Sequence, residues 1–280
     1  MTLCTVVPPG GIPSNTRLYE EYEEVMLESV LRKTTLVTKI LIAVPNPDLP
    51  DDANVEEWTE RNVQIKRFTV NTPGMSFGHA VGLHACIDRV DQEYILFSDP
   101  DVFYYTAIDQ FYLGLLNKHV LNYIGGSHHS AVANSYMFFP HFMSALVKKR
   151  DLPVPDFLRG KLFYRSILRV EELDRPEIGD QPADGKYLVQ GPIRSEYTRF
   201  PNKDPLANFD CGCNLYLWAQ EADWRWLAFQ TLDCHTYTSR LNRGNFKLNE
   251  RLSRERLFWH AARSDPQNFR ELWQQAKEEE

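Results

Sequence analysis

A short apolar stretch that ends abruptly in two carboxylates places the strongest constraint on the fold of this 280-residue chain. Residues 94–97 (YILF) are β-branched, aromatic or otherwise apolar, as expected of a strand that is buried on both faces. The strand should stop at Pro100, because proline cannot donate to a sheet ladder. Asp99 and Asp101 would then lie at the carboxyl end of a central strand, the edge where open α/β sheets bind ligands.

The spacing of these two carboxylates indicates a cation-binding site. Carboxylates this close repel each other unless a cation lies between them, and hard divalent ions prefer oxygen ligands. We therefore expect Asp99 and Asp101 to bind a divalent metal ion. A structural alternative is open at this point, because Asp-Pro-Asp is also favourable turn chemistry.

Alternating strand and helix patterns in the N-terminal part of the chain predict an α/β fold. The expected elements, in chain order, are a strand at 2–7, a helix at 17–32, strands at 37–44 and 62–70, a helix ending near Val90 and the strand at 94–97. Because successive strands are joined by helices or short connections, we expect a mainly parallel central sheet flanked by helices.

Three glycines spaced four residues apart, Gly74, Gly78 and Gly82, precede the strand and its carboxylates. With them, the stretch 74–101 (GMSFGHAVGLHACIDRVDQEYILFSDPD) resembles the nucleotide-sugar-dependent glycosyltransferases of the GT-A fold. The likeness is closest to the large inverting family with the pattern G-x-S-x-x-x-N-x-G, a helix, then G/E-Y-I-x-F-x-D-x-D. His79 and Ala80 stand where that family often carries Arg-Asn or a similar polar pair.

The resemblance implies a metal centre that holds the diphosphate of a sugar donor. Asp101 is the expected direct ligand, with Asp99 contacting ribose or a metal-bound water. His235 follows a strand pattern at 224–229 and is our expected third ligand, with His260 as the alternative. Mn²⁺ or Mg²⁺ suits carboxylate ligands, and an imidazole favours Mn²⁺.

The same resemblance implies a base and a set of donor contacts. Asp210 is the expected base that deprotonates the acceptor, although it could instead cap a helix that opens at Gly212. We expect 240–256 to be a basic loop that leads into a helix and clamps the diphosphate, with a solvated basic face as the alternative. The expected donor-binding residues are Val7, Pro8, Asn46, Asp48, Gly74, Gly78, His79, Asp99, Arg240 and Arg243.

These assignments imply one GT-A-like domain over residues 1–280. Residues 1–105 form the expected nucleotide-binding half, and 106–280 the acceptor half. The acceptor half contains a proline-rich, poorly periodic segment at 151–205, which we expect to be irregular. It ends in a helix at 265–280 that a capping box at Ser264 introduces.

Net charge, apolar runs and cysteine count argue against several classes of protein. A formal net charge of −7 disfavours nonspecific binding to nucleic acid by the chain as a whole. No apolar run approaches the roughly 20 residues of a membrane helix, and no basic, apolar leader opens the chain, so we expect a cytoplasmic protein without a transmembrane segment. The odd number of cysteines, 5, then argues for reduced thiols.

The sequence therefore predicts a metal-dependent, hexosyltransferase-like glycosyltransferase. Its partners would be a nucleoside-diphosphate sugar, with a UDP-sugar favoured, and a hydroxyl acceptor, with a saccharide favoured; inversion is implied by the resemblance alone. Two alternatives are open: sugar transfer onto modified nucleic acid along the basic segment 240–256, and a nucleotide-sugar-binding protein without turnover. No glycine- and lysine-rich N-terminal phosphate loop supports a nucleotidylyltransferase.

Overall fold

The computed structural model describes residues 1–8, 16–71, 75–132, 135–152, 186–188, 206–208, 224–231, 235–244, 248, 252, 255–261 and 266–279. The helices are α1 (Thr16–Lys33), α2 (Met75–Arg89), α3 (Ile108–His119) and α6 (Pro266–Glu278). The strands are β1 (Thr2–Val6), β2 (Lys39–Pro45), β3 (Glu56–Glu60), β4 (Val63–Val70), β5 (Tyr94–Ser98), β6 (Val102–Tyr104), β7 (Tyr123–Val132), β8 (Ser135–Lys148), β9 (Lys186–Leu188), β10 (Leu206–Asn208), β11 (Trp226–Thr231), β12 (Thr236–Gly244) and β13 (Arg256–His260).

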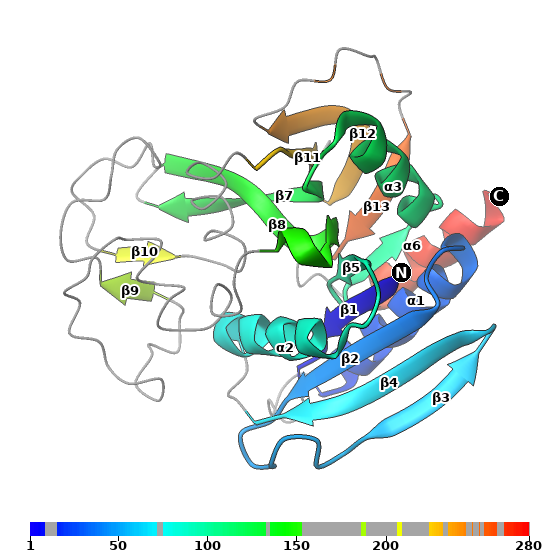
Figure 1. Ribbon diagram of the computed structural model, residues 1–280, viewed down its shortest axis with the longest axis vertical. Coiled ribbons are helices and arrows are strands. Elements are labelled where there is room, and N and C mark those ends of the chain that lie inside the picture. Colours follow the sequence, from blue (N-terminus) through cyan, green and yellow to red (C-terminus); the bar gives the residue numbers. More distant parts are fainter. Residues whose placement is uncertain are drawn as a thin grey trace.

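A large mixed sheet with helices on both faces forms the centre of the protein (Figure 1). Its strand order is β3-β4-β2-β1-β5-β8-β7-β11-β12-β13-β6. Strands β4, β2, β1 and β5 are parallel to one another, as expected from the strand–helix alternation. The α/β fold class is confirmed.

Beyond β5 most neighbouring strands of the sheet are antiparallel. Strand β8 runs antiparallel to β5 and β7, and β7 is in turn parallel to β11. Strands β12, β13 and β6 complete the sheet with antiparallel pairs. The expectation of a basic loop leading into a helix at 240–256 is wrong at both ends, because 240–244 belong to β12 and 256 opens β13.

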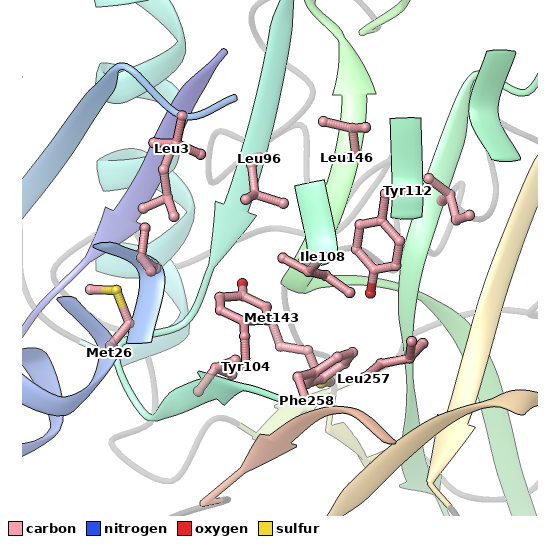
Figure 2. Close-up of a cluster of buried hydrophobic side chains, with 14 of the residues drawn as sticks. Leu3, Met26, Leu96, Tyr104, Ile108, Tyr112, Met143, Leu146, Leu257 and Phe258 are labelled. Atoms are coloured by element: carbon pink, nitrogen blue, oxygen red, sulfur yellow. The ribbon is translucent and has the colours of Figure 1, made fainter. Parts of the chain in front are cut away.

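Strand β5 is buried on both faces, as its sequence predicts. Leu96 joins one apolar cluster, in which α1 and α3 pack on the sheet (Figure 2). Ile95 and Phe97 face the opposite cluster, which contains Leu83 and Cys86 of α2. The helices therefore cover both faces of the parallel strands.

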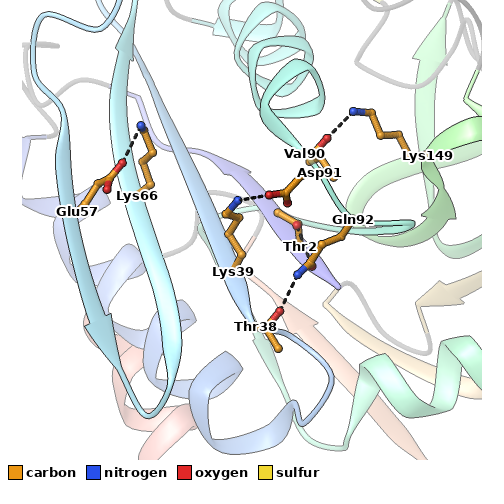
Figure 3. A network of polar contacts seen from close by, with 9 residues as sticks. All are labelled: Thr2, Thr38, Lys39, Glu57, Lys66, Val90, Asp91, Gln92 and Lys149. Atoms are coloured by element: carbon orange, nitrogen blue, oxygen red, sulfur yellow. Dashed lines mark hydrogen bonds and ion pairs between the residues drawn. The ribbon is translucent and has the colours of Figure 1, made fainter.

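Polar contacts fasten the strands of this half at their amino ends (Figure 3). Thr2 Oγ1 donates to Gln92 Oε1 at 3.0 Å, and Gln92 Nε2 donates to Thr38 Oγ1 at 2.8 Å. Lys39 Nζ pairs with Asp91 Oδ2 at 2.9 Å. The network therefore lies at the first residues of β1 and β2 and just before β5, at the edge of the sheet opposite to the carboxyl ends of these strands.

Helix α2 lies unusually close to β1. A Cβ atom added to Gly82 would come within 2.7 Å and 2.8 Å of the two Cγ atoms of Val6, and 3.4 Å from Ala43 Cβ. Real Cβ atoms do not approach other atoms so closely, so only glycine allows α2 to pack at this depth. The third of the regularly spaced glycines therefore sets how near α2 comes to the sheet.

None of the helices in the described part of the chain combines the length and apolar character needed to cross a membrane.

We expect Gly82→Ala to destabilise the fold by about 1–3 kcal/mol, because overpacking against the stiff Val6 side chain must displace the helix. Gly114→Ala is the matched control, since Gly114 lies within α3 and an added Cβ would meet nothing within 4 Å. That control should stabilise the protein by about 0.5–1 kcal/mol. Urea denaturation of both variants measures the difference, and equal effects would contradict the close packing of α2.

Candidate metal centre

Asp99 and Asp101 lie in the turn between β5 and β6, where Pro100 ends the buried strand. Asp99 stays attached to the sheet, since its backbone N–H donates to Met143 O of β8 at 2.8 Å. The backbone carbonyl of Asp101 accepts from Ala261 N at 2.8 Å, just after β13. The backbone of each aspartate is thus held by a different neighbouring segment, which restricts the separation of the two residues.

Strand β13 brings a histidine to this turn. It pairs antiparallel with β6, and in that register His260 stands opposite Val102, next to Asp101. His260 Nε2 lies 3.4 Å from Asp101 Oδ1 and 3.8 Å from Asp99 Oδ2. One ligand atom from each of these residues lies within 4.8 Å of the other two, so the three could hold one metal ion.

His235 lies behind this group. Its backbone carbonyl accepts from His260 N at 3.1 Å, and its Nδ1 lies 3.0 Å from His260 O. Its ring also packs on Trp259, with centroids 5.1 Å apart. Of the two histidines that the sequence offers as the third ligand, the structure therefore brings His260 to the carboxylates and gives His235 contacts with the backbone of His260.

Asp99 carries a buried oxygen that suits a cation. The residue is 8% exposed, and no hydrogen bond from the described residues reaches its Oδ1. No Lys or Arg in the described ranges forms an ion pair with it; the side chains that approach its carboxylate there are the imidazoles of His79 and His260. A buried carboxylate without compensating charge is costly, so the donor set of two carboxylates and an imidazole fits Mn²⁺ or Mg²⁺.

Two phenols near Asp99 remain protonated around neutral pH. Burial raises the pKa of Tyr104 to about 12, opposed by the hydroxyls of Ser98 and Ser144 and reinforced by the charge of Asp99. Burial, with a further contribution from Asp99, also raises the pKa of Tyr237. Neither tyrosine adds negative charge to the site, so any cation there is bound by the carboxylates and imidazole.

The loops after β1 and β2 lie at the same edge of the sheet as the carboxylates. Val7 is buried and its N–H donates to Ala43 O at 2.9 Å, so its side chain serves the core. Pro8 follows it and is partly exposed. Asn46 Oδ1 accepts from Asp48 N at 2.9 Å, which fixes the turn after β2 and leaves the Asp48 side chain exposed.

The remaining expected site residues divide into two groups. Gly78 and His79 lie in the first half of α2, and His79 Nε2 is 3.3 Å from Asp99 Oδ1. Gly74, Asp210 and the side chains of Arg240 and Arg243 lie outside the described residues. Strand β13 is not among the strands that the sequence predicts. Its pattern RLFWH, with apolar Leu257, Phe258 and Trp259 beside a terminal histidine, was a strand signal.

No protein-family model and no curated protein sequence matches this chain. Solved structures of similar fold include S. aureus TarS 1-349, at 13% identity and TM-score 0.32, covering 53% of this chain and 47% of TarS. The bifunctional IspDF from Campylobacter jejuni matches at 10% identity and TM-score 0.35, over 64% of this chain and 45% of IspDF. Mouse xyloside xylosyltransferase 1 matches at 8% identity and TM-score 0.41, over 84% and 86%.

This chain spans less than half the length of the TarS and IspDF structures that it matches. At such low identities and TM-scores, the function must be argued from the residues of the site.

The geometry predicts that His260→Ala weakens Mn²⁺ binding by more than the roughly 10–100-fold typical of losing a residue that only orients a ligand. His235→Ala should weaken it less, because Nδ1 of His235 lies against the backbone carbonyl of His260 and His235 is not in the group whose ligand atoms converge. Isothermal titration of Mn²⁺ into each variant, with melting curves to verify folding, makes the comparison. A loss in His235→Ala equal to that in His260→Ala would restore His235 as the ligand.

Proposed function

We propose that this protein is a metal-dependent glycosyltransferase that transfers a sugar from a nucleoside-diphosphate sugar to a hydroxyl acceptor. The observation that carries the proposal is the convergence of Asp99, Asp101 and His260 at the carboxyl end of β5. The stretch 74–101, which resembles inverting GT-A glycosyltransferases, leads directly into those carboxylates. A UDP-sugar is the favoured donor and a saccharide the favoured acceptor.

The chain supplies a largely buried site for the ion, in which hydrogen bonds hold the backbone of both aspartates. A divalent ion bound there would neutralise charge on the diphosphate as the nucleotide leaves. Asp101 and His260 bind it directly in this proposal, and Asp99 contacts it or a water on it. Backbone hydrogen bonds to β8 and to Ala261 hold the main chain of both aspartates, which limits the reorganisation needed when donor binds.

Sheet geometry supports placing the nucleotide over the parallel strands. Val6 of β1 pairs with Ala43 of β2, and Cys4 pairs with Phe97 of β5, so all three strands end at one edge. Ligands of open α/β sheets bind at that edge. We assign Pro8, Asn46 and Asp48 to the nucleoside, and Arg240 and Arg243 of β12 to the diphosphate.

The acceptor half of the proposal depends on Asp210. An inverting transfer needs a base that removes the proton of the acceptor hydroxyl. We assign this role to Asp210 within a single catalytic domain, in which residues 1–105 bind the nucleotide and 106–280 provide the acceptor side. Cytoplasmic placement goes with this proposal.

One prediction of the proposed function concerns the sugar donor. UDP-sugars with Mn²⁺ should raise the melting temperature, because a ligand that binds only the native state stabilises it by about 2.7 kcal/mol at one hundred times its Kd. GDP-, CDP- and TDP-sugars in the same screen identify the nucleotide. Asp101→Ala should melt like the wild type without ligand, since the side chain lies at a strand end, and should lose the Mn²⁺-dependent shift.

Turnover separates the enzyme from the alternatives. Slow donor hydrolysis without acceptor supports an enzyme, whereas a binding protein shows a thermal shift and no hydrolysis. Full activity in excess EDTA would end the metal hypothesis. Acceptor binding that weakens steeply with salt would instead favour sugar transfer onto nucleic acid.

A further prediction distinguishes two roles for Asp210, a catalytic base and a helix cap. Asparagine still offers a capping oxygen but cannot accept a proton near neutral pH. Asp210→Asn should therefore keep its melting temperature and donor affinity while losing about 10²–10⁴-fold in transfer rate. Near-normal transfer by this variant would make Asp210 structural and reopen a retaining mechanism.

A further inference from the structure

His79 approaches Asp99 from α2, whereas His260 approaches it from β13. It lies in α2, three residues before Gly82, so the two share the helix face that meets the sheet. The close approach of Gly82 to Val6 brings this face of α2 down onto β1, next to β5. The depth of α2 packing thus places an imidazole beside the carboxyl end of β5.

The two oxygens of Asp99 each face a different imidazole. Oδ1 lies 3.3 Å from His79 Nε2, and Oδ2 lies 3.8 Å from His260 Nε2. Within the described ranges, neither His79 Nε2 nor Asp99 Oδ1 makes a hydrogen bond, although both atoms are buried. Their separation is just beyond the usual range of about 2.7–3.2 Å, so a small rotation of the ring would align them.

We propose that His79 is a positioning residue that donates an Nε2–H hydrogen bond to Asp99 Oδ1 and turns Oδ2 toward the metal. The inference rests on the metal site of the proposed function and gives His79 a role different from direct donor contact. His79 is not one of the three residues whose ligand atoms converge, so it acts through Asp99.

The hydrogen bond matters because the backbone bond from Asp99 to Met143 does not fix the orientation of the Asp99 carboxylate. A carboxylate on a short side chain can rotate, and each alternative orientation reduces the fraction of molecules ready to bind the ion. Residues that orient metal ligands through hydrogen bonds typically contribute about 10–100-fold to metal affinity. The hydrogen bond from His79 also satisfies Asp99 Oδ1, a buried oxygen that faces α2 when Oδ2 is turned toward the ion.

The test is Mn²⁺ binding in the absence of donor, followed by the electron paramagnetic resonance signal of free Mn²⁺. His79→Ala should bind Mn²⁺ about 10–100-fold more weakly than the wild type. His79→Gln should recover most of that loss, because its amide can donate from nearly the same position. His84→Ala is the matched control: His84 is also buried in α2, but pairs with Asp88 at 3.2 Å, so its loss should leave Mn²⁺ affinity unchanged.

The outcomes are distinguishable. Mn²⁺ affinity in His79→Ala equal to the wild type would overturn the positioning role while leaving the metal site intact. No recovery in His79→Gln, together with nitrogen couplings from two imidazoles in the wild-type spectrum, would overturn it in favour of direct ligation. Absence of Mn²⁺ binding by the wild type would overturn both this inference and the metal part of the proposed function. Should His79→Ala fail to fold, His79→Leu, which keeps the volume, gives the same comparison.

Discussion

The pairing of β6 with β13 is the interaction on which the candidate site depends. Strand β6 has only three residues, so its backbone bonds alone would hold it weakly. Aromatic packing strengthens it: Phe103 stacks on Trp259 of β13 at 5.7 Å and also contacts Phe269 and Trp273 of α6. Because His260 directly follows Trp259, the packing that secures β13 also delivers the imidazole to Asp101.

The C-terminal helix extends this support to the N-terminal half. Trp273 Nε1 donates to Glu28 Oε2 at 2.8 Å, and Lys277 Nζ donates to Glu28 Oε1 at 3.0 Å. Glu28 belongs to α1, which also contributes Tyr22 to the aromatic cluster around Phe103. Helix α6 therefore ties β13 to the part of the chain that carries the carboxylates, and the site depends on both ends of the sequence.

Local signals predicted much of the fold, whereas pairing between distant strands could not be predicted. The double-sided burial of β5 follows from residues 94–97 alone, and proline placed the carboxylates at its end. The basic residues of 240–244 suggested a loop, yet there they form a strand. Strand formation depends on pairing with neighbouring strands, which the local sequence does not reveal. His235 and His260 both flank strand-like runs, so only the β12-β13-β6 order distinguishes them.

The negative charges of Asp99 and Asp101 are the reason why a cation suits this group of residues. The buried tyrosines near Asp99 stay neutral, so they cannot offset or add to the charge of the two aspartates. Hydrogen bonds from imidazoles can orient those carboxylates, and within the described ranges no Lys or Arg pairs with Asp99. A divalent ion supplies the two positive charges that two carboxylates require, and its own charge then becomes the largest in the site. The chain therefore brings a strand, a helix and a distant histidine to one buried aspartate, in a group whose ligand atoms could hold such an ion.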